Sequence, residues 1–293
     1  MRTIVSVAAI VTAVLLAGCA VGAAPTQTPP RSMLPNASAL TVAKGPHASN
    51  VVIVIMENRD YGLIIGSSQA PYINGTLVPQ AALMTNSHAV THPSEPNYLA
   101  FFSGSAQGIT DDSCPHTFST PNLGAALLAA GKTFDGYSES MPSNGYLGCS
   151  TNLYARKHNP WSDFSNVPAA SNLVYTGFPK PLPTVAIVVP NLCNDMHDCS
   201  TGTGDKWLSK NLPRILKYDA AHNGLLILTW DEADPDNNGK NQIATLLIGP
   251  TIVPGSYAQN VNHYAVLHTI EKLAGAACTA NACTAPLLKG MWK

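Results

Sequence analysis

Short apolar runs separated by longer mixed segments dominate the hydrophobic pattern of this chain. Runs rich in β-branched residues and bounded by polar or turn residues predict strands. These runs lie at 51–56, 134–138, 184–189, 225–230 and 244–248. Apolar positions at helical spacing predict helices at 122–130, 205–218 and 262–274. Strands alternating with helices are typical of a largely parallel central sheet with helices on both faces, so we expect an α/β fold.

Acidic or amide residues follow three of the predicted strands. Glu57 and Asn58 follow VVIVIM, Asn191 follows VAIVVP, and Asp231 with Glu232 follow LLILTW. Ligands of open α/β sheets bind where the parallel strands end. We therefore expect several oxygen ligands at one sheet edge, a set that suits a hard divalent cation or a phosphate-bearing site.

Each of these strand ends also has a purely structural interpretation. Glu57 and Asn58 could form a helix cap or a turn. Two adjacent carboxylates repel each other unless solvent or a cation lowers the cost, which favours Asp231 and Glu232 as metal ligands. The polar residues from Asp234 onward are typical of a solvated turn.

A serine lies between two prolines in the segment THPSEPNY. A helix starting at Pro96 would place Ser94 just before its N-terminus, where backbone N–H groups and the helix dipole favour an anion. A capping serine and a nucleophile at this position have the same sequence pattern, so both interpretations stay open.

Other candidate residues lie in segments without clear periodicity. His197 lies in a polar loop between Cys193 and Cys199, and His263 opens the last predicted helix. The insert at 139–183 contains Lys157 and His158, is rich in Pro, Ser and Asn, and is expected to form loops over the strand edge. A rigid loop between bonded cysteines would help to preorganise a site.

The N-terminal segment predicts export. A charged start, an apolar stretch at 4–16 and the residues Leu-Ala-Gly-Cys are typical of a signal peptide at 1–18. The ending resembles a bacterial lipobox, which would attach a diacylglyceryl group to Cys19; the alternative is an unlipidated secreted protein. A tether rich in Pro, Ala and Thr at 19–48 would then precede one domain at 49–293. No other apolar run is long enough to cross a membrane, so membrane contact is expected only through the lipid anchor.

Net charge, cysteine content and missing motifs exclude several classes of function. A net charge of -1 offers no basic surface for nucleic acid. The six remaining cysteines of an exported chain favour disulfides, and proximity pairs Cys193 with Cys199, Cys278 with Cys283 and Cys114 with Cys149. The alternative is that some are buried free thiols. The chain lacks HExxH, Walker-type and GxSxG motifs, which argues against a metalloprotease, a nucleoside-triphosphate enzyme and an α/β-hydrolase esterase.

Seven segments in order resemble the bacterial phospholipase C/acid phosphatase phosphoesterase family of the alkaline phosphatase superfamily. They are VVIVIMENRDY, THPSEPNYLAFFSG, YARKHNPW, VPNLCNDMHD, GDKWL, LTWDEAD and NHYAVLHTIE. The likeness is greatest to the small secreted acid phosphatases, including a mycobacterial type that acts on phosphoinositides. It extends from residue 51 to about residue 274.

The resemblance implies a role for each matching residue. Ser94 would be the nucleophile and would contact the metal ion, with Thr91 as the rival hydroxyl. The other implied metal ligands are Glu57, Asn58, Asp231 and Glu232. The residues implied around the phosphoryl group or the leaving group are Lys157, His158, His197 and His263. The implied substrate-binding residues are Asn97, Asn191 and Asp195. Two-metal relatives carry Asp and His ligands where this chain has Asn191 and Asp195, which puts a second metal in doubt.

The sequence thus predicts a monomeric, metal-dependent acid phosphatase. It would hydrolyse small phosphomonoesters or phospholipid head groups through a phosphoserine, with His197 or His263 protonating the leaving group. A protonated histidine predicts activity that falls as pH rises above about 6.5. Calcium or magnesium suits the oxygen ligands, whereas the histidines keep zinc or iron open. The alternatives are a phospholipase C or phosphodiesterase on the same site and a non-catalytic lipoprotein that binds a phosphate ligand.

Overall fold

A computed structural model of the protein describes residues 47–178, 181–234 and 240–293. These residues belong to one compact unit, Ala43–Lys293. The predicted signal peptide, the predicted lipid attachment at Cys19 and all but the last two residues of the predicted tether lie outside the described residues. No helix in the described ranges is both long and apolar enough to cross a membrane.

One sheet of nine strands organises the described part of the chain, in the order β10-β2-β9-β8-β1-β7-β3-β6, with β11 beside β2. The strands are β1 Val51–Met56, β2 Ala82–His88, β3 Phe134–Ser138, β6 Asn172–Val174, β7 Val185–Val189, β8 Leu225–Trp230, β9 Gln242–Ile248, β10 Gly255–Tyr257 and β11 Val261–Asn262. The block β8-β1-β7-β3-β6 is parallel, whereas β9 runs antiparallel to β8 and β2. The predicted largely parallel α/β fold is confirmed.

Strand β1 lies inside the parallel block, between β8 and β7, and both of its faces are apolar. All six of its residues are buried. Ile53 packs into one hydrophobic core, and its neighbours Val52 and Val54 pack into the other. Burying such a side chain stabilises the fold by about 1.5–3 kcal/mol.

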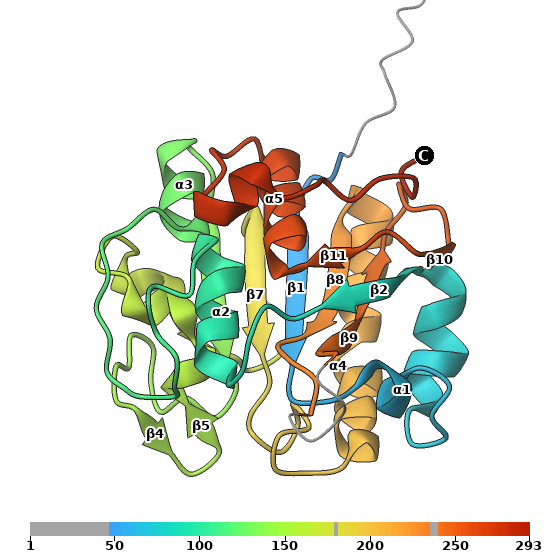
Figure 1. Ribbon diagram of the computed structural model, residues 1–293, viewed down its shortest axis with the longest axis horizontal. Helices are drawn as coiled ribbons and strands as arrows, with labels where there is room; N and C mark the ends of the chain where they lie inside the picture. Colours follow the sequence, from blue (N-terminus) through green and yellow to red (C-terminus); the bar gives the residue numbers. More distant parts are fainter. Residues whose placement is uncertain (1–46, 179–180, 235–239) are drawn as a thin grey trace, which may run out of the picture. The chain divides into compact units, whose positions relative to one another are not determined.

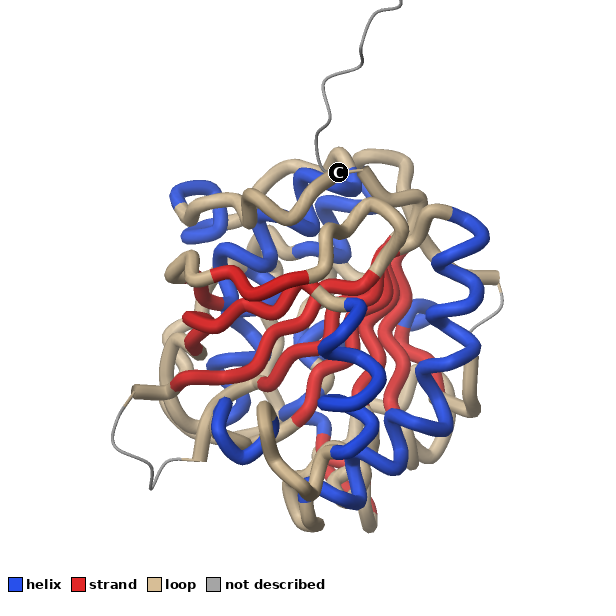
Figure 2. Tube along the Cα trace, turned by 90° about the vertical axis from the view of Figure 1, so that its right-hand side faces the viewer, coloured by secondary structure: helices blue, strands red, loops and turns tan. Residues whose placement is uncertain are grey.

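Five α-helices cover the two faces of the sheet (Figures 1 and 2). They are α1 Tyr61–Ile64, α2 Ser94–Ser103, α3 Leu123–Ala129, α4 Thr201–His222 and α5 His263–Ala274. Residues of α2, α3 and α5 join one core, and residues of α1 and α4 join the other. Helix α4 is longer than the predicted 205–218. Its polar first turn follows Ser200, whose side chain accepts a hydrogen bond from the Thr203 N–H, and apolar spacing could not reveal that turn.

The insert at 139–183 contains more regular structure than the predicted loops. It holds β4 Ser150–Thr151, β5 Tyr154–Ala155, the short helices η3 Arg156–His158, η4 Pro160–Asp163 and η5 Ala169–Ser171, and the sheet strand β6. The other short helices are η1 Ile73–Leu77, η2 Val78–Gln80 and η6 Ala280–Thr284. All three predicted disulfides form: Cys114–Cys149, Cys193–Cys199 and Cys278–Cys283.

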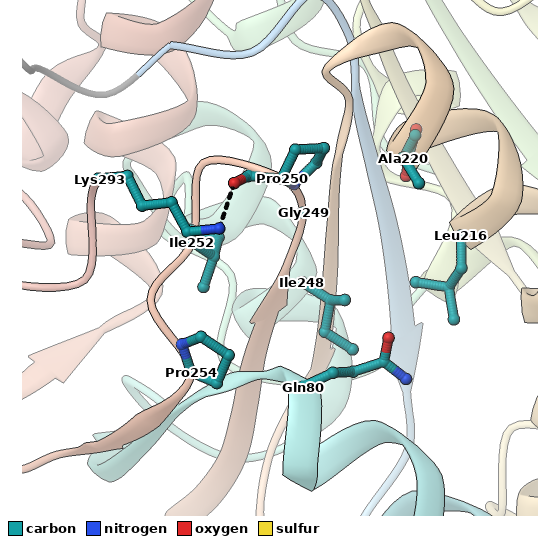
Figure 3. A pocket seen from close by; sticks show the side chains of 10 residues that line it. Gln80, Leu216, Ala220, Ile248, Gly249, Pro250, Ile252, Pro254 and Lys293 are labelled. Atoms are coloured by element: carbon teal, nitrogen blue, oxygen red, sulfur yellow. Dashed lines mark hydrogen bonds between the residues drawn. The ribbon is translucent and has the colours of Figure 1, made fainter.

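A cavity of about 350 Å³ lies at the amino edge of the parallel strands, where β9 ends beside the start of β8 (Figure 3). Its lining is mostly apolar and includes Leu216, Ile248 and Ile252. The Lys293 ammonium donates a hydrogen bond to the Pro250 carbonyl oxygen at 2.6 Å. The candidate residues from the sequence follow the carboxyl ends of the strands, at the opposite edge.

Candidate active site

The segments that follow β1, β7 and β8 meet at the carboxyl edge of the sheet. The Glu57 N–H donates to the Asp195 carbonyl oxygen at 2.8 Å, and the Asp231 N–H donates to the Met56 carbonyl oxygen at 3.0 Å. Asn58 adopts a left-handed φ of 37° and donates its N–H to the Asp231 carboxylate at 3.0 Å. These backbone contacts bring together residues that are far apart in the sequence, at the edge where ligands of parallel sheets bind.

Ser94 is the first residue of α2, so the helix begins two residues before the predicted start at Pro96. Pro93 occupies the N-cap position, and Ser94 is therefore not the capping residue. The buried Ser94 Oγ lies 3.1 Å from Glu57 Oε2, 3.3 Å from Asn58 Oδ1 and 3.3 Å from Glu232 Oε1. The Thr91 hydroxyl instead donates to the His92 carbonyl oxygen at 3.2 Å.

Four carboxyl groups are buried together around this hydroxyl, those of Glu57, Asp195, Asp231 and Glu232, and we call them the acid cluster. Burial raises the pKa of Glu57 well above its usual value, and the nearby Asp231 and Asp195 raise it further. Burial also raises the pKa of Asp231 to about 6, and burial together with Asp231 raises that of Glu232 to about 8. Burial is the cause that these groups share, and repulsion between neighbouring carboxylates adds to it at Glu57 and Glu232.

The acid cluster has the properties of a cation site. In the part of the chain that the structure describes, Asp195 Oδ2 and Asp231 Oδ2 are buried without a hydrogen-bond partner. Leaving a buried carboxylate oxygen unpaired is costly, and a divalent cation among these oxygens would remove that cost. The residues therefore fit a metal ion, as the sequence predicts.

Two histidines extend the possible ligand set beyond oxygen. Atoms of Glu57, His158 and His197 lie within 4.8 Å of one another and could hold a metal ion. His158 is buried, stacks on Tyr98 at 5.0 Å, and its Nε2 lies 3.3 Å from Glu57 Oε1. Burial and then the Lys157 charge hold the pKa of His158 well below its usual value, which favours the neutral imidazole that binds metals. Imidazole ligands broaden the choice of metal toward zinc or iron.

His263 has surroundings that differ from those of a proton donor. Its buried ring donates from Nε2 to the Asp231 carbonyl oxygen at 2.5 Å and meets the Phe101 ring edge-on at 5.7 Å. Burial lowers the pKa of His263 to about 4. A histidine that is neutral and already bonded holds a strand end in place, so the geometry favours His197 over His263 as the proton donor.

Asn97 and Asn191, predicted to bind substrate, use their amides to hold loops. Asn97 Oδ1 accepts the N–H groups of Val90 and Thr91, both at 3.1 Å, and its Nδ2 donates to the Thr91 carbonyl oxygen at 2.8 Å. Asn191 Oδ1 accepts the N–H groups of Cys193 and Asn194. Turn chemistry of this kind is common for Asn and explains both positions without a substrate.

Three further residues of the site were not found from the sequence. His92 Nδ1 lies 2.5 Å from Glu232 Oε2, and the Tyr98 hydroxyl donates to Glu57 Oε1. Both positions could have been found, because His92 precedes Ser94 by two residues and Tyr98 follows it by one helical turn. Asp112, which accepts from the Lys157 ammonium at 2.8 Å, gives no such signal because it lies in a polar loop.

Comparisons with known proteins agree with this geometry. Residues 67–276 match the Phosphoesterase family. A phosphatidylinositol-3-phosphatase of Mycobacterium tuberculosis is 45% identical over 253 residues, which cover 84% of each chain. An acid phosphatase of Aspergillus fumigatus is 30% identical over 240 residues, which cover 74% of this chain but only 53% of that protein.

The fold has solved counterparts. A protein of the alkaline phosphatase superfamily from Vibrio parahaemolyticus superposes with a TM-score of 0.57 at 14% identity, covering 83% of this chain and 71% of that one. The predicted superfamily fold and the predicted enzyme class, a hydrolase of phosphoric esters, are confirmed. By its sequence, the chain belongs to the Phosphoesterase family.

Proposed function

We propose that the protein is a metal-dependent phosphatase that hydrolyses phosphate monoesters with Ser94 as its nucleophile. The observation that carries this proposal is the position of the Ser94 hydroxyl, at a helix start and within 3.1–3.3 Å of three side-chain oxygens. A hydroxyl surrounded by carboxylate and amide oxygens can donate its proton and then attack. The first turn of α2 directs N–H groups and a positive dipole end toward an incoming anion.

The proposed metal ligands are the oxygens near Ser94, namely Glu57, Asn58, Asp231 and Glu232, with His158 as an additional donor. A divalent cation bound there would neutralise the carboxylates and polarise a phosphoryl oxygen. Tyr98 and His92 each bind one carboxylate oxygen, of Glu57 and Glu232 respectively, and thereby orient these side chains.

The reaction proceeds in two steps on the side chains of this chain. The Ser94 Oγ transfers its proton to Glu57 Oε2, 3.1 Å away, and forms a bond to phosphorus. The bond between phosphorus and the leaving oxygen breaks, and that oxygen takes a proton from His197. Water then gives a proton to His197 and attacks phosphorus, the bond between phosphorus and Ser94 Oγ breaks, and Oγ takes its proton back from Glu57 as phosphate leaves.

Asp198 orients the proposed proton donor. The Nδ1 of His197 lies 2.7 Å from Asp198 Oδ1, so Nε2 remains for the leaving group. The Lys157 ammonium would offset negative charge on the phosphoryl oxygens. A histidine donor must be protonated, which supports activity on the acid side of neutrality.

Phosphoinositides are the natural substrates that the comparison with the mycobacterial phosphatidylinositol-3-phosphatase supports best. An exported location belongs to the proposal as well, because three disulfides persist best in an oxidising compartment. Lipid attachment at Cys19 would then place the enzyme at a membrane surface that carries such lipids.

A matched pair of hydroxyl variants tests the nucleophile. Ser94→Ala should lower kcat/KM for p-nitrophenyl phosphate at least ~10³-fold, whereas Thr91→Ala should stay within about threefold of wild type. Thr91 is a suitable control because it is the neighbouring hydroxyl and donates only to a backbone carbonyl. Substantial turnover by Ser94→Ala would exclude Ser94 as the nucleophile.

Two further measurements address the competing functions. A higher kcat/KM for bis-p-nitrophenyl phosphate than for the monoester would assign the enzyme to the phosphodiesterases. Phosphate binding without measurable hydrolysis of any ester, in protein loaded with each candidate metal, would indicate a non-catalytic binding protein.

A further inference from the structure

Asp112 connects two parts of the proposed active site. Its Oδ1 accepts the backbone N–H of Glu95 at 3.0 Å, in the first turn of α2 directly after Ser94. Its Oδ2 accepts a hydrogen bond from the Lys157 ammonium at 2.8 Å. One carboxylate therefore binds both the helix that presents the nucleophile and the cation proposed to meet the phosphoryl group.

A covalent link stabilises the same arrangement. Cys114, two residues after Asp112, is bonded to Cys149 of the insert. The Cys149 carbonyl oxygen accepts the N–H of Arg156, the residue before Lys157. The loop that carries Asp112 and the helix η3 that carries Lys157 are thus held together by a disulfide, a backbone hydrogen bond and an ion pair.

More than one carboxylate attracts the Lys157 ammonium. Burial opposes its charge, but Asp112, Glu57 and Asp231 together raise the pKa of Lys157 above its usual value. The next residue, His158, has its Nε2 3.3 Å from Glu57 Oε1, so Lys157 is adjacent in the chain to a residue that contacts the acid cluster. The lysine stem is long and flexible, so removing the nearest anion would leave the acid cluster as the main attraction for the ammonium.

We propose that Asp112 is a positioning residue that holds the Lys157 ammonium beside the first turn of α2 and away from the acid cluster. Held there, the ammonium meets phosphoryl oxygens of the substrate. Released, it pairs with the acid cluster and competes with the metal ion. This inference rests on the proposed phosphatase function.

A double-mutant cycle separates this role from a merely structural one. Asp112→Asn removes the charge but keeps an oxygen that can accept the Glu95 N–H. In otherwise wild-type enzyme, Asp112→Asn should raise KM for p-nitrophenyl phosphate about 10-fold or more and lower kcat less. In a Lys157→Met background the same substitution should change KM less than about twofold, because it can act only through the ammonium.

Two additional variants complete the design. Asp112→Glu keeps the carboxylate, so its KM should be closer to that of wild type than the KM of Asp112→Asn is. Asp111→Asn is the matched control, because Asp111 is an exposed neighbour whose carboxylate accepts hydrogen bonds from Ser113. The metal affinity of each protein, measured by calorimetry with the metal alone, should weaken several-fold in Asp112→Asn and recover in the double variant.

Binding of inorganic phosphate to the metal-loaded protein keeps the two proposals distinguishable. If wild type binds phosphate but hydrolyses no ester, the proposed function fails, and coupling between positions 112 and 157 in phosphate affinity still supports the positioning role. An equal loss from Asp112→Asn in both backgrounds, in KM and in phosphate affinity, would overturn the positioning role even in a fully active enzyme.

Discussion

The two edges of the parallel sheet bury carboxyl groups in opposite ways. At the amino edge, Asp219 is buried and accepts a hydrogen bond from Asn50 Nδ2 at 2.9 Å, beside a mostly apolar cavity. At the carboxyl edge, the four carboxyls of the acid cluster lie together. Their partners include a serine hydroxyl, a tyrosine hydroxyl, the Asn97 amide, a histidine and backbone N–H groups.

The difference shows what burial alone can and cannot explain. Burial raises the pKa of Asp219 to about 6, and the Asn50 amide partly opposes that shift. At the acid cluster burial acts as strongly, but neighbouring carboxylates add to it. The Asn50 amide pairs with the single carboxyl of Asp219, whereas several carboxyl groups buried together form a site that a divalent cation would stabilise.

Metal removal should separate the two edges most strongly. Exhaustive chelation is expected to lower phosphatase activity at least ~10³-fold, because the carboxylates and Ser94 lose the charge that organises them. Activity on p-nitrophenyl phosphate should return when the cognate divalent ion is restored, and metal analysis of the purified protein identifies that ion. Full activity in the chelated protein would contradict the metal assignment.

Neutralising one carboxyl at each edge tests the comparison directly. Glu57→Gln should lower kcat/KM by about 10²–10⁴-fold, whereas Asp219→Asn should change it less than about threefold. In metal-free protein, Glu57→Gln should increase stability although it lowers the activity of the metal-loaded enzyme. Glu57→Gln removes repulsion within the acid cluster, so its melting temperature should rise above that of metal-free wild type.

The same pair of variants also reports on metal binding. A divalent ion at saturating concentration should raise the melting temperature of wild type and of Asp219→Asn, and should raise that of Glu57→Gln much less. Equal stabilisation of all three proteins would place the cation away from the acid cluster.

The two candidate proton donors should respond differently to the leaving group. His197→Gln should lower kcat about 10–10²-fold for an alkyl phosphate and much less for p-nitrophenyl phosphate, whose leaving oxygen needs little protonation. His263→Gln keeps a donor for the Asp231 carbonyl oxygen and should affect both substrates equally and weakly. If His197→Gln lowered kcat equally for both substrates, His197 would instead be a metal ligand.

The smallest expected effect concerns a buried carboxyl on neither edge. Burial raises the pKa of Glu271 to about 7, although the Thr279 hydroxyl opposes the shift. The folded state then holds a proton that the unfolded state loses between pH ~4.5 and 7, so stability should fall as pH rises through that window. Glu271→Gln should make this fall in the free energy of unfolding smaller by about 1 kcal/mol. Urea unfolding at several pH values measures the difference. An unchanged pH dependence would exclude Glu271 as its source.

The sequence predicted the fold well where local pattern and tertiary packing agree. β1 and β8 form at the predicted residues because each is largely apolar on both faces, and β3 also forms at the predicted residues although it contains Asp135 and Ser138. β2, at Ala82–His88, was missed because it ends in polar residues, and its pairing with the antiparallel β9 depends on partners distant in sequence.

Sequence pattern also predicted only part of the arrangement of the candidate site. The strand-end ligands and Ser94 were predicted from short motifs, and they do lie together. His263 and Asn97 were assigned to the leaving group and to the substrate, but His263 bonds a backbone carbonyl, and Asn97 bonds backbone groups and lies 3.4 Å from Glu232 Oε2. Residue type alone cannot separate a side chain that touches substrate from one that holds a ligand-bearing loop, because both need the same polar atoms.

Trapping the covalent intermediate tests the central claim most directly. Metal-loaded enzyme mixed with a phosphomonoester, quenched rapidly in acid and digested, should yield a peptide that carries one phosphoryl group on Ser94, and Ser94→Ala should yield none. A phosphoryl group on Thr91 or on a histidine, or turnover with no phosphorylated peptide at any quench time, would contradict the account.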